Sequence, residues 1–349
     1  MDVRPGHGRF RILIIRLSAI GDVVLCSYLI RNLRIRFPEA EIDFLVKSRY
    51  ASIPGQDRRI DHVLEMTDHA GLGEILHLAG RLRKNDYDVV LDLQGNARSI
   101  ALSLLSGAKK KARCRAERLN RFMLVHFKKD LYTECVPVPL RYAGSVRFLG
   151  LRDDGLGLDF FVSPEADEGL ARVEKKMDFP GEGRLIVLAP GAGRKTKRWP
   201  AGRYAELGDH FSRTGCRIAL VGGDQDREAC LSVLGQMKHP AFDFSGRLSL
   251  QESAALIRKA SLVVANDTGM MHVACGLGIP VAAIFGPTTR HFGFMPFRAV
   301  SAVLECSLDC RPCSYHGSER CPESHFGCMD GISVPEVIRA AENLMQESQ

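Results

Sequence analysis

Short apolar runs alternate with amphipathic stretches along most of the chain. The runs have the length and the β-branched content of strands that are buried on both faces of a parallel sheet. We predict strands at 11–16, 41–46 and 88–95 in the first half and at 184–189, 216–221, 262–265 and 281–285 in the second. A helical pattern over 25–36 stops at Phe37-Pro38, because a proline disfavours helical backbone in the residue before it. Strands that alternate with helices predict an α/β fold with doubly wound parallel sheets.

The alternation weakens between two glycine-containing segments, 153–157 and 180–183. At 349 residues the chain is long enough for two domains of ordinary size. We therefore predict an N-terminal domain over 1–165, a second domain over 166–332 and a terminal helix over 333–349.

One predicted strand in the second half leads into a polar turn that opens a helix. Asn266 or Asp267 can cap that helix, and Gly269 allows a ligand to approach the backbone closely. A helix N-terminus at the carboxyl edge of a parallel sheet presents free N–H groups and about half a positive charge, which favours a phosphate. Thr268 adds a hydroxyl, and His272 lies about one helical turn further on. The alternative is an ordinary α/β unit in which the aspartate only caps the helix and the histidine bonds to the backbone.

A glycine-rich, basic loop at 190–200 follows another predicted strand. It does not satisfy the Gly-x-x-x-x-Gly-Lys-[Ser/Thr] pattern of Walker-type ATPases. Its small residues, its basic side chains such as Lys197 and the helix after it nevertheless suit contact with a phosphate. We expect Trp199, the only tryptophan, to anchor the loop by packing. Further on, Asp224 follows a strand and could accept hydrogen bonds from ribose hydroxyls.

The turn after the first strand contains a single glycine, Gly21, where dinucleotide-binding proteins carry Gly-x-Gly-x-x-Gly. This difference counts against an enzyme that uses NAD or FAD. The same turn carries a carboxylate, Asp22. Asp22 either caps the helix that follows or acts as a general base that faces a cleft between the two domains.

The composition is that of a globular protein, with 45% hydrophobic and 26% charged residues. No apolar run reaches the roughly 18 residues of a transmembrane helix, and the first residues contain no signal-peptide core. We therefore expect a cytoplasmic protein. The net charge of +7 and the pI of about 8.9 favour anionic partners such as nucleotides, nucleic acids or an acidic membrane surface.

Part of this charge is concentrated between Lys109 and Lys129, where nine side chains are basic and one is acidic. Such a run is usually a solvated face of a helix or loop. The functional alternative is a docking surface for a polyanionic substrate, which we place on Lys109, Lys110, Lys111, Arg113 and Arg115. A nucleic-acid-binding module is an alternative of another class. It is disfavoured because only Phe122 and Phe127 interleave the run, too few for stacking on single strands.

Five of the eleven cysteines lie close together near the C-terminus, and the other six are scattered singly. Cys310, Cys313, Cys321 and Cys328 have the short-pair spacing of a structural Zn or Fe site. In a reducing cytosol a metal site is favoured over disulfides. Free thiols are the alternative, because the second pair is wider than Cys-x-x-Cys. Two Asp-x-Asp triplets are too short a pattern to indicate a catalytic metal, and we expect none.

Five motifs occur in a fixed order: RLSAIGDV at 16–23, DLQG at 92–95, KRWP at 197–200, NDTGMMH at 266–272 and FGPT at 285–288. Together they resemble glycosyltransferase family 9, the heptosyltransferases of lipopolysaccharide assembly, and the match covers most of the chain. The resemblance implies the GT-B fold, in which two Rossmann-like domains face a cleft and the second domain holds most of the nucleotide sugar. It also implies that the terminal helix packs back toward the first domain.

The resemblance further implies inverting, metal-independent transfer of heptose from ADP-heptose to the inner core of lipopolysaccharide. The acceptor would be linked to a lipid, and the enzyme would be peripheral to the inner membrane. Nucleic acid would not be a partner. By resemblance Asp22 is the base. Lys197, Asp267, Thr268 and Gly269 would bind the diphosphate, Asp224 the ribose, and His272 the donor neighbourhood. The basic run would face the acceptor. A different nucleotide sugar or a protein acceptor is the alternative, and the cysteine cluster departs from the plainest members of the family.

Overall fold

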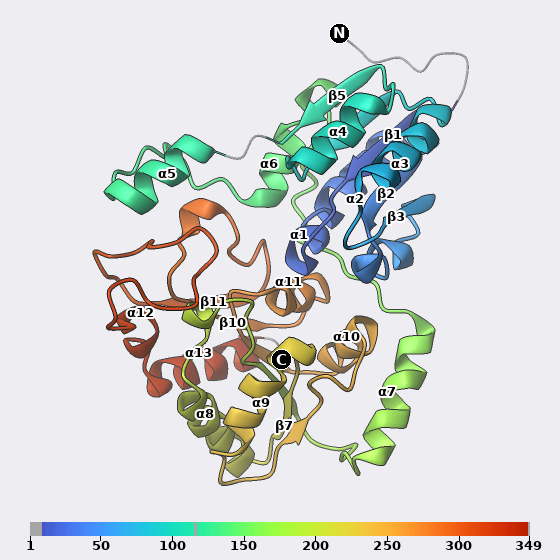
Figure 1. Ribbon diagram of the computed structural model, residues 1–349. Helices are drawn as coiled ribbons and strands as arrows, with labels where there is room; N and C mark the ends of the chain where they lie inside the picture. Colours follow the sequence, from blue (N-terminus) through green and yellow to red (C-terminus); the bar gives the residue numbers. More distant parts are fainter. Residues whose placement is uncertain (1–8, 115–116, 348–349) are drawn as a thin grey trace. The chain divides into compact units, whose positions relative to one another are not determined.

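The computed structural model describes residues 9–114 and 117–347 (Figure 1). The chain divides into two compact units. Unit 1 is Met1–Glu117 together with Val138–Leu156, and unit 2 is Arg118–Pro137 together with Gly157–Gln349. Each unit is built around one parallel sheet, so the predicted α/β fold with two doubly wound sheets is confirmed.

Unit 1 contains a five-stranded sheet in the order β3-β2-β1-β4-β5. The strands are β1 (Arg11–Ile15), β2 (Glu41–Lys47), β3 (His62–Met66), β4 (Val89–Asp92) and β5 (Lys110–Arg113). All neighbours are parallel, with Ile12 paired to Ile42 on one side and to Val89 on the other. The order reverses direction between β1 and β4. In sheets of this kind ligands bind at such a switch point, outside the carboxyl ends of the strands.

The helices of unit 1 cover this sheet and bury its apolar side chains. They are α1 (Ile20–Val24), α2 (Ser27–Arg36), α3 (Leu72–Lys84), α4 (Ala97–Leu105) and α6 (Val138–Gly144). Leu13 and Ile15 of β1 pack with Leu78 and Leu82 of α3 in one buried cluster. The predicted end of α2 at Phe37 is confirmed.

Unit 2 contains a six-stranded sheet in the order β11-β10-β9-β6-β7-β8. The strands are β6 (Leu185–Ala189), β7 (Arg217–Leu220), β8 (Phe242–Asp243), β9 (Leu262–Asn266), β10 (Val281–Phe285) and β11 (Ser301–Glu305). The register pairs Val187 of β6 with Val263 of β9, and the neighbours are again parallel. In this sheet the reversal lies between β6 and β9.

The helices of unit 2 are α5 (Arg118–Phe127), α7 (Pro164–Lys176), α8 (Ala201–Arg213), α9 (Arg227–Leu234), α10 (Leu250–Arg258), α11 (Gly269–Gly276), α12 (Gly327–Asp330) and α13 (Val334–Glu347). None of the helices in the described part of the chain is long and apolar enough to cross a membrane. Trp199 is 2% exposed and packs in the core, as predicted.

Two predictions about domain organisation are corrected. The division between the units falls at Leu156/Gly157 rather than at 165, and residues 118–137 belong to unit 2 although unit 1 resumes after them. The reason is that Leu124 and Val125 of α5 pack with Phe292 of unit 2.

The terminal helix α13 also belongs to unit 2. Val337, Ala341 and Leu344 are buried with side chains of β9, β10 and β11 in a single core. In Figure 1 the helix lies along α8, which it contacts. The apolar face of α13 is therefore covered by the sheet of unit 2, whose strands precede the helix in the chain.

Candidate functional site

In unit 1 the motifs at 16–23 and 92–95 come together at the switch point between β1 and β4. The side chain of Gln94 connects them, because its Oε1 accepts hydrogen bonds from the backbone N–H groups of Leu17 and Ser18 at 3.0 and 3.1 Å. Asp92 shapes the second motif by accepting hydrogen bonds from the N–H groups of Gln94 and Gly95. Gly95 has a φ of +67°, a backbone conformation that favours glycine.

Asp22 lies in the first turn of α1 and forms an ion pair with Arg16. The distance from Arg16 Nη2 to Asp22 Oδ2 is 2.6 Å. The same oxygen accepts the N–H of Ala19 at 3.4 Å, so the residue caps α1 as well. Its Oδ1 has no hydrogen-bond partner among the described residues, and the side chain retains 22% exposure. The carboxylate is thus held through one oxygen while the other is available.

Arg16 is itself fixed by its surroundings. Its Nη1 donates to the carbonyl of Leu93 at 2.6 Å, and its guanidinium lies 5.9 Å from the ring centre of Tyr142. Burial acts to lower the pKa of Arg16, but the neighbouring charge of Asp22 outweighs it and raises the pKa above its ordinary value. The arginine therefore stays charged beside Asp22 at every working pH.

In unit 2 the corresponding switch point carries a second ion pair. Lys197, which follows β6, places its Nζ 2.7 Å from Asp267 Oδ2 at the end of β9. Thr288, which follows β10, donates its hydroxyl to the same carboxylate oxygen at 2.9 Å. All three side chains are largely or fully buried. Three of the motifs are thereby joined at one edge of the sheet.

The capping expected of Asn266 or Asp267 is not what the structure shows. Asn266 is fully buried and ties together the loop that precedes α8: its Oδ1 accepts the N–H of Trp199, and its Nδ2 donates to the carbonyl of Pro190. Asp267 is engaged by Lys197. The N-cap position of α11 is taken by Thr268. The Thr268 hydroxyl is buried and has no hydrogen-bond partner among the described residues, so it can donate to a ligand.

The other predicted donor residues lie on the same edge. Gly269 is the first residue of α11, and His272 is buried in the next turn, 3% exposed. Asp224 is exposed in a short 3-10 helix after β7, next to Gly246. Asp226, which the sequence analysis did not select, is more enclosed: a methyl group added at Gly191 would lie 2.2 Å from its carboxyl carbon, and burial raises the pKa of Asp226.

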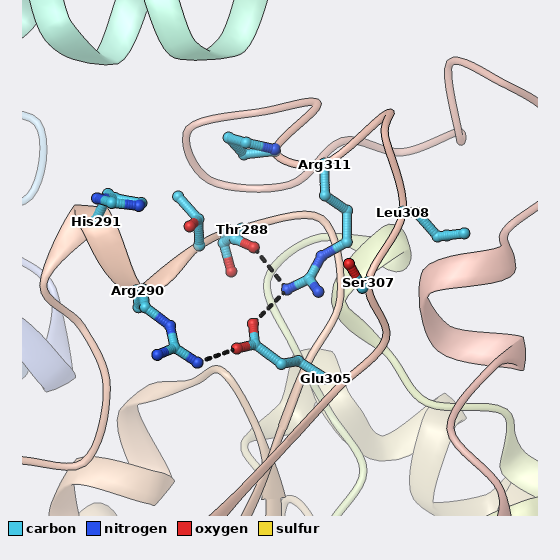
Figure 2. Close-up of a pocket in the computed structure, with 9 residues that line it drawn as sticks. Thr288, Arg290, His291, Glu305, Ser307, Leu308 and Arg311 are labelled. Atoms are coloured by element: carbon cyan, nitrogen blue, oxygen red, sulfur yellow. Dashed lines mark hydrogen bonds and ion pairs between the residues drawn. The ribbon is translucent and has the colours of Figure 1, made fainter. Parts of the chain in front are cut away.

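A pocket of about 380 Å³ continues this edge past the ends of β10 and β11 (Figure 2). It is lined by Thr288, Thr289, Arg290, His291, Glu305, Ser307, Leu308, Arg311 and Pro312. Arg311 Nη2 donates to the carbonyl of Thr288 and pairs with Glu305, both at 2.9 Å, and Arg290 Nη2 pairs with the other oxygen of Glu305 at 2.8 Å. Sequence reasoning did not select Arg290, Glu305 or Arg311, because no local pattern marks them.

The family of the chain follows from comparison with known proteins. The model of glycosyltransferase family 9 (heptosyltransferase) matches residues 75–325, well over half of the chain. The chain belongs to glycosyltransferase family 9. It is therefore a glycosyltransferase, and the sites at the two switch points belong to an enzyme of that class.

Individual members of the family are similar over most of their length. Lipopolysaccharide heptosyltransferase 2 of Escherichia coli is 27% identical over 295 residues, which are 81% of this chain and 84% of that protein. The structure of the family 9 glycosyltransferase from Veillonella parvula covers 97% of both chains with a TM-score of 0.80 and 24% identity. The structure of E. coli ADP-heptose lps heptosyltransferase II covers 97% of this chain and 99% of that one, with a TM-score of 0.76 and 24% identity. These neighbours confirm the GT-B fold.

In this glycosyltransferase the basic run is divided between the two units. On unit 1, Lys109 pairs with Asp88 at 2.7 Å, Lys110 lies over the Phe148 ring, Lys111 donates to a backbone carbonyl and Arg113 pairs with Asp92 at 3.3 Å. Arg115 lies outside the described residues. On unit 2, Lys128 donates to the carbonyls of Cys310 and Pro312. Several charges of the run thus have local structural partners.

The four cysteines of the predicted metal site lie between residues 310 and 328 of unit 2. Burial and the neighbouring thiols of Cys313, Cys321 and Cys310 raise the pKa of Cys328 to about 11. Cys310 Sγ also lies 3.7 Å from His325 Nε2. Among the described residues no three of these thiols lie within 4.8 Å of one another, and the ligand atoms that do are those of Glu41, Asp43 and His62.

Proposed function

We propose that this glycosyltransferase transfers a heptose from ADP-heptose to the inner core of lipopolysaccharide. The observation that carries the proposal is the buried constellation of Lys197, Asp267 and Thr288 beside the N-terminus of α11. It combines a cation, the free N–H groups of a helix and the unpartnered Thr268 hydroxyl, which are groups that bind a diphosphate. The sugar is named by the relatives, which include lipopolysaccharide heptosyltransferases 1, 2 and 3.

The proposed reaction is a single displacement with inversion at the anomeric carbon. Asp22 takes the proton from the acceptor hydroxyl through its available Oδ1, while Arg16 holds Oδ2. The acceptor oxygen forms a bond to the anomeric carbon as the bond from that carbon to the diphosphate breaks. The leaving ADP takes up the negative charge, which Lys197 and the N-terminus of α11 stabilise. In this scheme Asp224 contacts the ribose and His272 lies beside the donor.

We further propose that transfer needs no metal ion, because Lys197 and a helix N-terminus supply the positive charge that a divalent cation would otherwise provide. The acceptor is proposed to be lipid-linked, with the enzyme at the cytoplasmic surface of the inner membrane. Lys109, Lys110, Lys111 and Arg113 would then contribute to attraction of its anionic groups. Their attraction would weaken as salt is added.

A structural metal ion is proposed at Cys310, Cys313, Cys321 and Cys328. Four cysteines in one segment supply the ligand type that Zn and Fe prefer, and their thiols would have to draw closer together and lose their protons on binding. Elemental analysis of the purified protein should find about one equivalent of Zn or Fe per chain, and Cys321→Ser should lose it and lower the Tm. Full activity and an unchanged Tm in a protein that contains neither metal would contradict the proposal.

Donor binding tests the proposed function directly. By calorimetry with EDTA present, the protein should bind ADP-heptose at least ten times more tightly than GDP- or UDP-sugars. Thr268→Val, which keeps the shape of the side chain and removes its hydroxyl, should weaken ADP-heptose binding about tenfold, as expected for a hydrogen bond to a charged group. Preference for another nucleotide sugar would keep the diphosphate site and overturn the named donor.

A further inference from the structure

The pocket in Figure 2 lies beyond the proposed diphosphate site on the same sheet edge. The strands of the sheet of unit 2 follow one another in the order β7, β6, β9, β10 and β11. Asp224 follows β7, Lys197 follows β6 and Asp267 follows β9. A nucleotide sugar with its ribose near β7 and its diphosphate between β6 and β9 therefore directs its transferable end toward β10. Thr288 connects the two places, since its hydroxyl contacts Asp267 and its carbonyl accepts from Arg311.

The pocket has an excess of positive charge and hydrogen-bond donors. Two guanidinium groups face one carboxylate, Glu305, whose two oxygens each hold one of them. Glu305 is half-buried, and although burial alone would raise its pKa, Arg290 and Arg311 lower it, so the acid stays ionised and keeps both arginines in place. The hydroxyl-bearing residues Thr289 and Ser307 also line the pocket.

Arg311 is the buried part of this arrangement. Its side chain is only 9% exposed, and its Nε is buried without a hydrogen-bond partner among the described residues. Arg290, in contrast, is 64% exposed. Arg311 Nη1 donates to the carbonyl of Cys306 and Nη2 is shared by Thr288 and Glu305, so Nε is the donor that Arg311 retains. A buried and an exposed guanidinium at the wall of a polar cavity form a site for an oxyanion, to which guanidinium donates strong hydrogen bonds.

We propose that this pocket binds a carboxylate or phosphate group of the acceptor. A neutral heptose carries no charge that could pair with the positive charge of the pocket. The donor diphosphate is proposed to bind at Lys197 instead. The assignment to the acceptor rests on the proposed heptosyl transfer, whereas the oxyanion site itself does not. Arg290 and Arg311 are then specificity determinants that select acidic acceptors.

Inorganic phosphate is the probe that separates this pocket from the diphosphate site. Calorimetric titration should show phosphate bound to the protein that is already saturated with ADP. Arg290→Gln should weaken phosphate binding about tenfold and leave ADP affinity within about twofold of wild type. Arg290→Lys should recover part of the loss because the charge is restored. Arg258→Gln is the matched control, since Arg258 forms a similar arginine–carboxylate pair with Asp167 elsewhere in unit 2, and it should bind phosphate as wild type does.

Three results would overturn the oxyanion site: exclusion of phosphate by ADP, unchanged phosphate affinity in Arg290→Gln, or no phosphate binding by the wild type.

The acceptor role is tested by transfer kinetics. Arg290→Gln should raise the KM for an acidic acceptor about tenfold and leave the KM for ADP-heptose unchanged, and the difference should vanish with an acceptor whose carboxylates are esterified and phosphates removed. A rise in the donor KM instead would assign the pocket to the donor. If ADP-heptose supports no transfer, the proposed function fails while the phosphate titration still tests the site.

Discussion

At the scale of single residues, the proposed role of Asp22 as the base makes Arg16 a positioning residue. The 2.6 Å ion pair occupies Oδ2 and leaves Oδ1 for the acceptor. Arg16→Gln should lower kcat about tenfold to a hundredfold, because the carboxylate loses the partner that fixes its rotamer, while the affinity for ADP stays unchanged. Steady-state kinetics and ADP calorimetry check this. An unchanged kcat would show that the ion pair does not orient the base.

Some site residues could be predicted from the sequence, and others could not. Lys197 and Asp267 were predictable because each follows a buried strand, and parallel strands place their carboxyl ends at one edge. The role of Asn266 was predicted wrongly, since its partners, Pro190 and Trp199, are distant in the sequence. Arg290 and Glu305 carry no local pattern at all. Only the pairing of β10 with β11 brings Glu305, at the end of β11, close to the segment after β10 that contains Arg290.

At the scale of elements, the pairing of β2 with β3 carries a pH-sensitive contact. Asp43 and His62 face each other in the register, and His62 Nδ1 lies 3.0 Å from Asp43 Oδ1. This hydrogen bond, together with the charges of Asp43 and Glu41, raises the pKa of His62. Its contribution to stability is therefore fully present below the unfolded pKa, about 6.5, and is lost as the pH rises through the folded value.

His62→Gln should accordingly flatten the pH dependence of stability on the alkaline side of pH 6. Urea unfolding at pH 6 and pH 8 should show a larger loss for the wild type than for the variant. The difference should be small, because the His62 side chain is 62% exposed and solvent screens the interaction. A variant that loses as much stability as the wild type would contradict the assignment.

The placement of α13 makes another prediction at this scale. Leu344 is 4% exposed in the core of unit 2, so Leu344→Ala should reduce the free energy of unfolding by about 2–4 kcal/mol. Asn343→Ala, one residue away on the exposed side, should change it by less than about 0.5 kcal/mol. Urea denaturation monitored through Trp199 reports on the same core. Equal effects of the two substitutions would contradict the packing of this helix.

The existence of most elements could be predicted because buried parallel strands are continuous apolar runs. The edge strands β3, β5 and β11 were not recognised, because they are mixed in polarity and partly exposed, and the edge strand β8 was not recognised because it has only two residues. The packing of α13 on the sheet of unit 2 could not be predicted for a different reason. An amphipathic helix shows in its sequence that one face is covered, but not by which sheet.

At the scale of the whole molecule, both sheets carry their candidate residues at the point where strand order reverses. Asp22 lies between the ends of β1 and β4, and the Lys197–Asp267 pair lies between the ends of β6 and β9. In the proposed mechanism, base chemistry therefore belongs to unit 1 and diphosphate binding to unit 2. The division of the basic run between the units was not predictable, because residues that are consecutive in the sequence can belong to different compact units.

The central claim is that Asp22 is the base in a metal-free heptosyl transfer. The most direct measurement is transfer from ADP-heptose to a lipopolysaccharide inner-core acceptor in EDTA, comparing the wild type with Asp22→Asn. The account predicts transfer by the wild type and at least about a hundredfold loss in the variant, because general base catalysis contributes roughly 10²–10⁴-fold. The ADP-heptose affinity should stay within about twofold, because the proposed donor site lies in the other unit. Near wild-type transfer by Asp22→Asn, or transfer that requires a divalent ion, would contradict it.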